Sequence, residues 1–260
     1  MEKYKTKSID DNDNFVVTDA YLKLYNVFRC LKTSKGHFIH VIGSPGTGKS
    51  SNIYYAINDI DLNVYNVTLF LDSVKKSPND VFKEIFNGIK KGTGAKTKED
   101  VYKKVKEYDV ILFADKFLDS KFLDPQKVGF SDWVDYNGIK SLPFYLLCCL
   151  EYLKHKHEFK EINIILHHSW MIKLNGTKYD LLTDFGLISK AIVSTLNLLF
   201  EVVKISYSRS ETIKIIKSHS NEANENLIKF WIHKYGFKPR YILEAIENNN
   251  NDNNKRKRYN

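Results

Sequence analysis

The octet Gly-Ser-Pro-Gly-Thr-Gly-Lys-Ser, at residues 43–50, constrains the fold of this 260-residue chain more than any other feature. It follows an apolar strand predicted over 37–42 and opens a helix predicted over 50–58, the context that a phosphate-binding loop requires. Its glycines let the backbone turn successive N–H groups inward, and the dipole of the next helix favours negative charge. The motif therefore predicts a nucleotide site in an α/β domain, with ATP favoured over GTP.

The residues of this loop have separate roles in the predicted site. Lys49 supplies a positive charge near the β- and γ-phosphates, and the Ser50 hydroxyl is a ligand for Mg²⁺. ATP and Mg²⁺ are the expected cofactors. The predicted nucleotide-binding residues are Gly43, Ser44, Pro45, Gly46, Thr47, Gly48, Lys49, Ser50 and Ser51.

A Mg²⁺ site of this kind also needs a carboxylate at the end of a nearby strand. Asp72 and Asp115 both follow apolar runs. Asp115 is favoured as the second metal ligand because its strand comes third, after a full crossover. Asp72 is then a polar residue that ends an outer second strand.

Apolar runs that alternate with helical patterns predict a parallel sheet. The expected strands are 37–42, 64–71, 108–115, 162–166 and 200–206. A helix is predicted over 180–198, and three more over 210–218, 224–234 and 239–248. The sequence thus predicts an α/β fold: a five-stranded parallel P-loop NTPase sheet flanked by helices, with a small C-terminal α-helical lid. The expected division is a core over 1–206, the lid over 207–248, and a disordered, Asn-rich basic tail over 249–260.

The composition excludes several classes of protein. No run of about 18 apolar residues occurs, and the N-terminus lacks an apolar signal segment, so no membrane contact and a cytoplasmic location are expected. Three cysteines lack the spacing of a disulfide framework or a metal site and are interpreted as buried thiols. Forty Lys and Arg against 31 Asp and Glu give a net charge of +9, which permits contact with DNA.

Further motifs give the chain a family resemblance. Phe15-Val16-Val17 precede the first helix, Ser77-Pro78-Asn79-Asp80 follow the second strand, and Gly236-Phe-Lys-Pro-Arg240 lies in the lid. Together with the loop, these resemble the AAA+ ATPases, and most of all the branch of replication initiators and loaders. The resemblance implies that Arg240 reaches the γ-phosphate from the lid and that Ser169 orients the attacking water. His167 and His168 compete with Ser169, and no zinc site is proposed there.

The chain also departs from that family. Where the family has Asp-Glu at the end of the third strand, this chain has Asp115-Lys116, and a protonated lysine cannot activate water; Asp119 is a conceivable substitute. Lys190 is the only cation in the helix where an arginine finger is expected, and Arg209 follows too late. ATP hydrolysis is therefore expected to be slow, partner-stimulated or absent. No winged-helix domain is expected after residue 248.

Three functions fit these observations. The first is an ATP-binding switch in DNA-associated processes such as replication or loading. The second is a regulatory or remodelling ATPase that acts on a protein partner or self-associates, with an aromatic-containing connection at 116–141 as a contact loop; its aromatic residues are Phe117, Phe122, Phe130 and Trp133. The third, a small-molecule kinase, is disfavoured because Arg209 and Arg240 are the only arginines between residues 151 and 250.

Overall fold

The computed structural model describes residues 14–66, 78–114, 142–174, 177–220 and 223–258. The strands are β1 (Phe38–Ile42), β2 (Val64–Asn66), β3 (Ile111–Ala114), β4 (Asn163–His168), β5 (Met171–Leu174), β6 (Thr177–Asp180) and β7 (Glu201–Lys204). The helices are α1 (Asp19–Cys30), α2 (Lys49–Ile60), α3 (Pro78–Thr93), α4 (Lys98–Glu107), α6 (Leu142–Lys154), α7 (Lys156–Phe159), α8 (Leu187–Leu196), α9 (Arg209–His219), α10 (Glu225–Tyr235) and α11 (Pro239–Arg258).

Five strands form one parallel sheet in the order β2-β3-β4-β1-β7. All five predicted strands are present, so the predicted α/β fold is confirmed. β1 lies between β4 and β7 and is buried along its whole length, as expected of a strand paired on both sides and covered on both faces. β2 is at the edge of the sheet.

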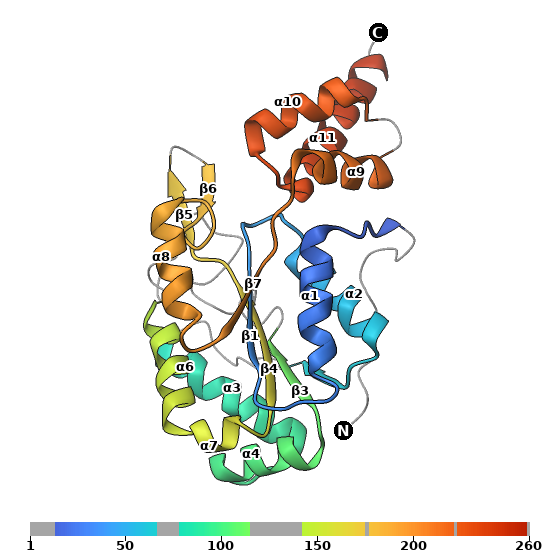
Figure 1. Ribbon diagram of the computed structural model, residues 1–260. Coiled ribbons are helices and arrows are strands. Elements are labelled where there is room, and N and C mark those ends of the chain that lie inside the picture. The colour runs from blue at the N-terminus through green and yellow to red at the C-terminus, as the bar shows by residue number, and fades with distance from the viewer. Residues whose placement is uncertain (1–13, 67–77, 115–141, 175–176, 221–222, 259–260) are drawn as a thin grey trace.

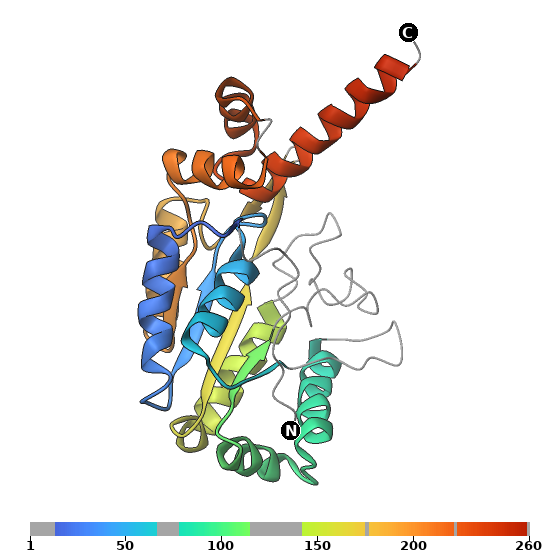
Figure 2. The ribbon, with the colours of Figure 1, turned by 90° about the vertical axis from the view of Figure 1, so that its right-hand side faces the viewer.

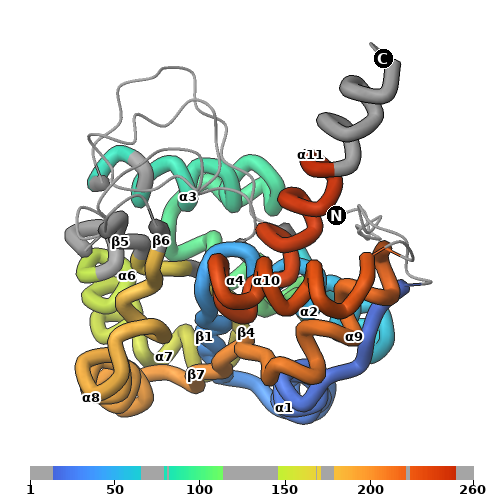
Figure 3. Tube along the Cα trace, turned by 90° about the horizontal axis from the view of Figure 1, so that it is seen from above, coloured from blue at the N-terminus to red at the C-terminus, as the bar shows by residue number. Residues whose placement is uncertain are grey.

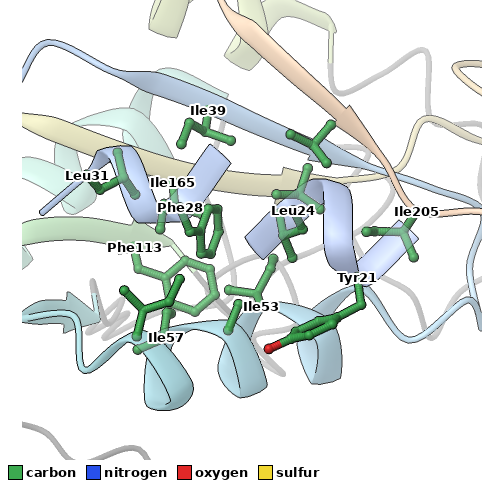
Figure 4. Packing of buried hydrophobic residues seen from close by; sticks show 14 of the residues in the cluster. Tyr21, Leu24, Phe28, Leu31, Ile39, Ile53, Ile57, Phe113, Ile165 and Ile205 are labelled. Carbon is green, nitrogen blue, oxygen red and sulfur yellow. The ribbon is translucent and has the colours of Figure 1, made fainter. Parts of the chain in front are cut away.

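Helices cover both faces of this sheet (Figure 1). On one face α1 and α2 pack through apolar side chains such as Leu24, Phe28 and Ile53 against Ile39, Phe113 and Ile165 of the strands (Figure 4). On the other face lie α3, α4, α6, α7 and α8. The phosphate loop leaves β1 at the carboxyl end of the sheet, between these two layers of helices.

The lid consists of α9, α10 and α11, which pack around a small apolar core of their own that includes Ile216, Ile228 and Ile242. A capping box opens α9, because the Ser208 hydroxyl accepts from the Glu211 backbone while the Glu211 carboxylate accepts from the Ser208 backbone. Seen from above, the lid lies over the carboxyl ends of the central strands (Figure 3).

The last helix is longer than the sequence pattern indicates. α11 continues through the Asn-rich stretch to Arg258, so it includes residues expected to have no regular structure, and it extends away from the body of the molecule (Figure 2). Adding residues to an existing helix costs far less than starting one, which accounts for the extension. Among the described residues, no helix is long and apolar enough to cross a membrane.

Two further differences concern local structure. An antiparallel hairpin, β5–β6, follows β4, and helix α8 begins at Leu187 rather than at residue 180. Leu174 pairs with Thr177 across an Asn-Gly dipeptide, a strong hairpin signal in a segment for which no element was predicted. The interpretation of all three cysteines as buried was wrong: Cys30 is exposed at the end of α1, whereas Cys148 and Cys149 are partly buried.

Candidate functional site

The phosphate loop turns tightly between β1 and α2. A Cβ atom at Gly43 would lie 2.7 Å from the Ile205 carbonyl oxygen, so only glycine fits this position without displacement. Gly48 has a φ of 72° and stands directly before the first residue of α2, in the left-handed region that glycine tolerates. Within the loop, the Thr47 backbone N–H and hydroxyl both donate to the Ser44 carbonyl, at 3.2 and 2.8 Å. The loop is thus closed on itself.

Lys49 and Ser169, which the sequence assigns to one site, are brought together. The Lys49 ammonium donates to the Gly43 carbonyl at 2.7 Å and to the Ser169 hydroxyl at 3.2 Å. It also lies 3.4 Å from the Ser44 carbonyl. Ser169 reaches this position because β4, which ends one residue earlier, is paired with β1. The Lys49 ammonium therefore lies at the centre of the loop, where it could bind phosphate oxygens.

The other predicted loop and metal residues are placed as follows. Ser50 and Ser51 lie in the first turn of α2, where Ser50 is partly buried and Ser51 is exposed. Asp115, the predicted second ligand for Mg²⁺, comes directly after Ala114 of β3 and lies outside the described residues. So do Asp72, Lys116, Asp119 and the aromatic residues of the 116–141 connection.

The lid touches the loop through the beginning of α11. The Arg240 backbone N–H donates to the Gly46 carbonyl at 3.2 Å. A Cβ atom at Gly46 would lie 3.3 Å from the Tyr241 ring, so this aromatic side chain packs directly on the loop. The Arg240 guanidinium has a different environment: its side chain is 60% exposed and Nε donates to Glu244 at 3.0 Å. The structure therefore brings the Arg240 backbone, and not its charge, to the loop.

A cluster of polar residues that sequence reasoning missed joins the loop to the lid. The Ser44 hydroxyl donates to Asp184 at 2.5 Å and lies 3.1 Å from the Thr183 hydroxyl. Lys238, from the turn before α11, places its ammonium 3.6 Å from the other Asp184 carboxylate oxygen. Asp184 thus bridges a residue of the loop and a residue of the lid.

Asp180 anchors this cluster from beneath. Its fully buried carboxylate accepts from the Trp170 backbone at 2.8 Å, from the Leu182 backbone at 3.2 Å and from the Thr183 hydroxyl at 2.8 Å. Burial raises the pKa of Asp180, while these hydrogen bonds and the Lys49 charge oppose that rise. The segment 180–184 is thereby fixed beside the loop. An Asx-type pattern at Asp180 was the signal available in the sequence.

A second connection supports the loop from the side of α2. Asn52 donates to the Tyr207 hydroxyl at 2.7 Å and to the Gly48 carbonyl at 2.8 Å. Burial raises the pKa of Tyr207 to about 12, so its phenol remains protonated. Because Tyr207 lies in the short link between β7 and the lid, this contact ties that link to the phosphate loop.

The remaining sequence candidates lie near this centre or on the surface. His167 is partly buried at the end of β4, with its ring centroid 5.9 Å from that of Phe113. Lys190 is exposed on α8, and Arg209 is exposed at the first position of α9. Among the residues that the structure describes, no three His, Cys, Asp or Glu side chains gather as a metal site would require.

Comparison with known proteins gave matches among solved structures only. No family model and no curated protein matches the chain. The chain is similar to AMPPCP-bound DnaA from Aquifex aeolicus, with a TM-score of 0.43 and 19% identity over 90% of this chain and 62% of that one. The same values hold for replication initiator DnaA bound to AMPPCP and single-stranded DNA. For Drosophila ORC bound to DNA the TM-score is 0.45, with 12% identity over 91% of this chain and 56% of that one. The chain therefore matches less than two thirds of the length of each of these proteins.

Proposed function

We propose that this chain binds ATP with Mg²⁺ at residues 43–51 and is a nucleotide-dependent switch in DNA-associated processes. The observation that carries this proposal is the position of the Lys49 ammonium, held by the Gly43 carbonyl and the Ser169 hydroxyl at the start of α2. Phosphate oxygens would take the place of these neutral acceptors and form stronger, charge-assisted hydrogen bonds. The helix dipole of α2 favours the same anion.

The residues present suit a magnesium nucleotide. The Ser50 hydroxyl in the first turn of α2 and the Asp115 carboxylate after β3 would hold the ion, which would neutralise charge on the phosphates. Arg240 remains a candidate for a contact between lid and nucleotide. Lys116 in place of a glutamate supports slow or partner-stimulated hydrolysis, since a protonated lysine cannot accept a proton from water.

The contact between lid and loop supports a switch. The Arg240 backbone and the Tyr241 ring both meet Gly46, the part of the loop that phosphates would approach. A ligand in the loop would therefore change the position of the lid relative to the loop. The two positions of the lid would be the two states of the switch. A net charge of +9 supports nucleic acid as the partner whose binding depends on the state of the switch.

ATP turnover and nucleotide affinity, each measured with and without DNA, test this function. Wild type should bind ATP, and Lys49→Ala should weaken binding at least tenfold, because the charge at the phosphates is lost. Lys32→Ala, which removes an exposed lysine next to α1, is the matched control and should leave affinity unchanged. A wild-type protein that neither binds nor hydrolyses ATP would refute the proposal.

DNA association is tested by itself with a salt series. Binding to DNA should weaken steeply as salt rises, since it depends on the release of counterions. Nucleotide binding without any DNA shift would reject the DNA part only. Formation of ADP that depends on a small-molecule acceptor would instead favour a kinase.

A protein partner is the alternative, and a specific surface favours it. Leu146, Leu150 and Leu153 are spaced along one side of α6 and are each at least half exposed. Leu187 and Ile188, at the beginning of α8, are exposed as well. Apolar side chains that recur at helical spacing on a surface are typical of protein contacts. ATP-dependent self-association or remodelling without DNA binding would favour this function.

A further inference from the structure

Lys238 is a buried lid cation that lies beside Asp184, a hydrogen-bond partner of the phosphate loop. Its residue is only 9% exposed, and its ammonium lies 3.6 Å from Asp184 and 5.5 Å from the centre of the Tyr179 ring. A lysine is rarely this well buried unless it has a partner of opposite charge. Arg240, two residues further on, is 60% exposed and pairs with Glu244 on its own helix.

From this contrast we infer that Lys238, and not Arg240, contacts the terminal phosphate of the bound nucleotide. In the absence of a triphosphate, Lys238 pairs with Asp184. The inference rests on the proposed function, because it requires a nucleotide in the loop. It adds a specificity-determining residue to that site: Lys238 would distinguish a nucleoside triphosphate from a diphosphate.

Asp184 holds Lys238 at the end of the loop where the outer phosphates would lie. One Asp184 oxygen accepts from the Ser44 hydroxyl, and the other faces the Lys238 ammonium. The Ser44 carbonyl is in turn 3.4 Å from the Lys49 ammonium, which marks the position of the β- and γ-phosphates. A single carboxylate therefore separates Lys238 from Ser44, a loop residue whose carbonyl contacts the Lys49 ammonium.

The charges explain why a triphosphate would draw Lys238 from Asp184. A carboxylate carries one negative charge, whereas a terminal phosphate carries about two charges and has three strong acceptor oxygens. Lysine has a long flexible stem and a compact charge, so its ammonium can change partners while its backbone stays in place. Asp180 and Asp184 are joined through Thr183 and the Asp180 backbone, so the released carboxylate remains hydrogen-bonded. A diphosphate lacks the group that competes for the lysine.

Titration calorimetry with ADP and with a non-hydrolysable ATP analogue, both with Mg²⁺, tests the inference. The quantity of interest is the ratio of the two affinities. Lys238→Met should lower the preference for the triphosphate about tenfold, the loss expected for one charge-assisted contact, and leave ADP affinity within twofold. Lys217→Met removes another lid lysine, whose partner Glu225 lies inside the lid, and should leave the ratio unchanged.

Asp184→Asn is a second variant, for which the expected change in affinity for the ATP analogue is opposite to that of Lys238→Met. Its amide oxygen can still accept from Ser44, but it no longer competes for Lys238, so affinity for the ATP analogue should rise several-fold while that for ADP changes little. This variant decides the question if Lys238→Met does not fold. Unchanged or weaker ATP-analogue binding in Asp184→Asn would then overturn the inference.

The outcomes separate this inference from the function on which it rests. If wild type binds neither nucleotide, the proposed function fails and the role of Lys238 fails with it. If wild type prefers the triphosphate but Lys238→Met keeps that preference, only the role of Lys238 is refuted. A larger loss of preference in Arg240→Met than in Lys238→Met would assign the role to the arginine.

Discussion

His40 shows how a single residue can make the stability of this fold depend on pH. It lies in the middle of β1 and is 1% exposed, with its ring stacked on Phe200 at 4.3 Å and edge-on to Phe38 at 4.9 Å. Burial among these rings lowers the pKa of His40 to about 3, since the charged imidazolium would lose its hydration. In the unfolded chain its pKa returns to about 6.5.

Acid should therefore destabilise the fold through His40. Below pH 6.5 the unfolded chain binds a proton that the folded chain does not, so this part of the stability falls steadily until pH 3. The difference amounts to about 2 kcal/mol at pH 5. Urea unfolding of wild type and His40→Leu at pH 7 and pH 5 measures it. The variant should lose about 2 kcal/mol less than wild type over this interval; equal losses would contradict the pKa shift.

At the scale of elements, a buried carboxylate fixes α4 against α6. Glu151 is 8% exposed and accepts from the Lys98 ammonium at 2.6 Å and from the Tyr102 hydroxyl. Burial and this hydrogen bond raise the pKa of Tyr102, so the phenol stays protonated and keeps donating. His155, one turn beyond Glu151, lies 3.5 Å from the same carboxylate. Two helices far apart in the sequence are thus held by one acceptor.

Replacing this acceptor should loosen the pair of helices. Glu151→Gln should lower the free energy of unfolding by about 1–3 kcal/mol, because its amide cannot satisfy both Lys98 and Tyr102. Glu107→Gln, which removes a surface carboxylate paired with Lys103 and Lys104, is the matched control and should cost less than about 1 kcal/mol. Chemical denaturation measures both, and a smaller effect at Glu151 than at Glu107 would contradict this account.

Elements with a strong local signal were predictable, and contacts between distant segments were not. The loop at Gly43–Ser50 could be predicted because its structure depends on the backbone and side chains of eight consecutive residues. The hairpin β5–β6 has a local signal in Asn175-Gly176, although no element was predicted for this segment. Asp184 and Lys238 were out of reach, since 54 positions separate them and only the placement of the lid joins them. The exposure of the Arg240 side chain likewise depends on how α11 is rotated.

The whole molecule is a sheet domain and a lid connected by few residues. Ile205 donates its backbone N–H to Ile42 at 2.8 Å, and Tyr207 is buried against Asn52, so the link holds closely to the core. On the other side, the Asp19 backbone donates to Glu211 of α9 at 2.9 Å. The lid is therefore anchored at its beginning and rests on the loop at α11.

A ligand in the loop should stabilise the folded protein and slow hydrogen exchange in the lid. With an ATP analogue at about 100 times its Kd, the folded state should gain about 2.7 kcal/mol, and the amides of α9, α10 and α11 should exchange more slowly. Lys49→Ala, which binds at least tenfold more weakly, should gain no more than about 1.4 kcal/mol at the same concentration and show less protection. Hydrogen exchange with peptide resolution measures this; protection confined to the loop would mean that nucleotide and lid are not coupled.

Because α11 is long, a small tilt at its contact with Gly46 would move its far end by a larger distance. Its twenty residues span about 30 Å at the rise of an α-helix, and its first turn meets the loop. Such a helix would act as a lever that pivots beside the phosphate loop. A tilt of about 10° at Arg240 displaces the far end by about 5 Å over that length. A shift of ångström size in the loop would then be amplified at the far end of α11, where the sequence is Lys255-Arg256-Lys257-Arg258.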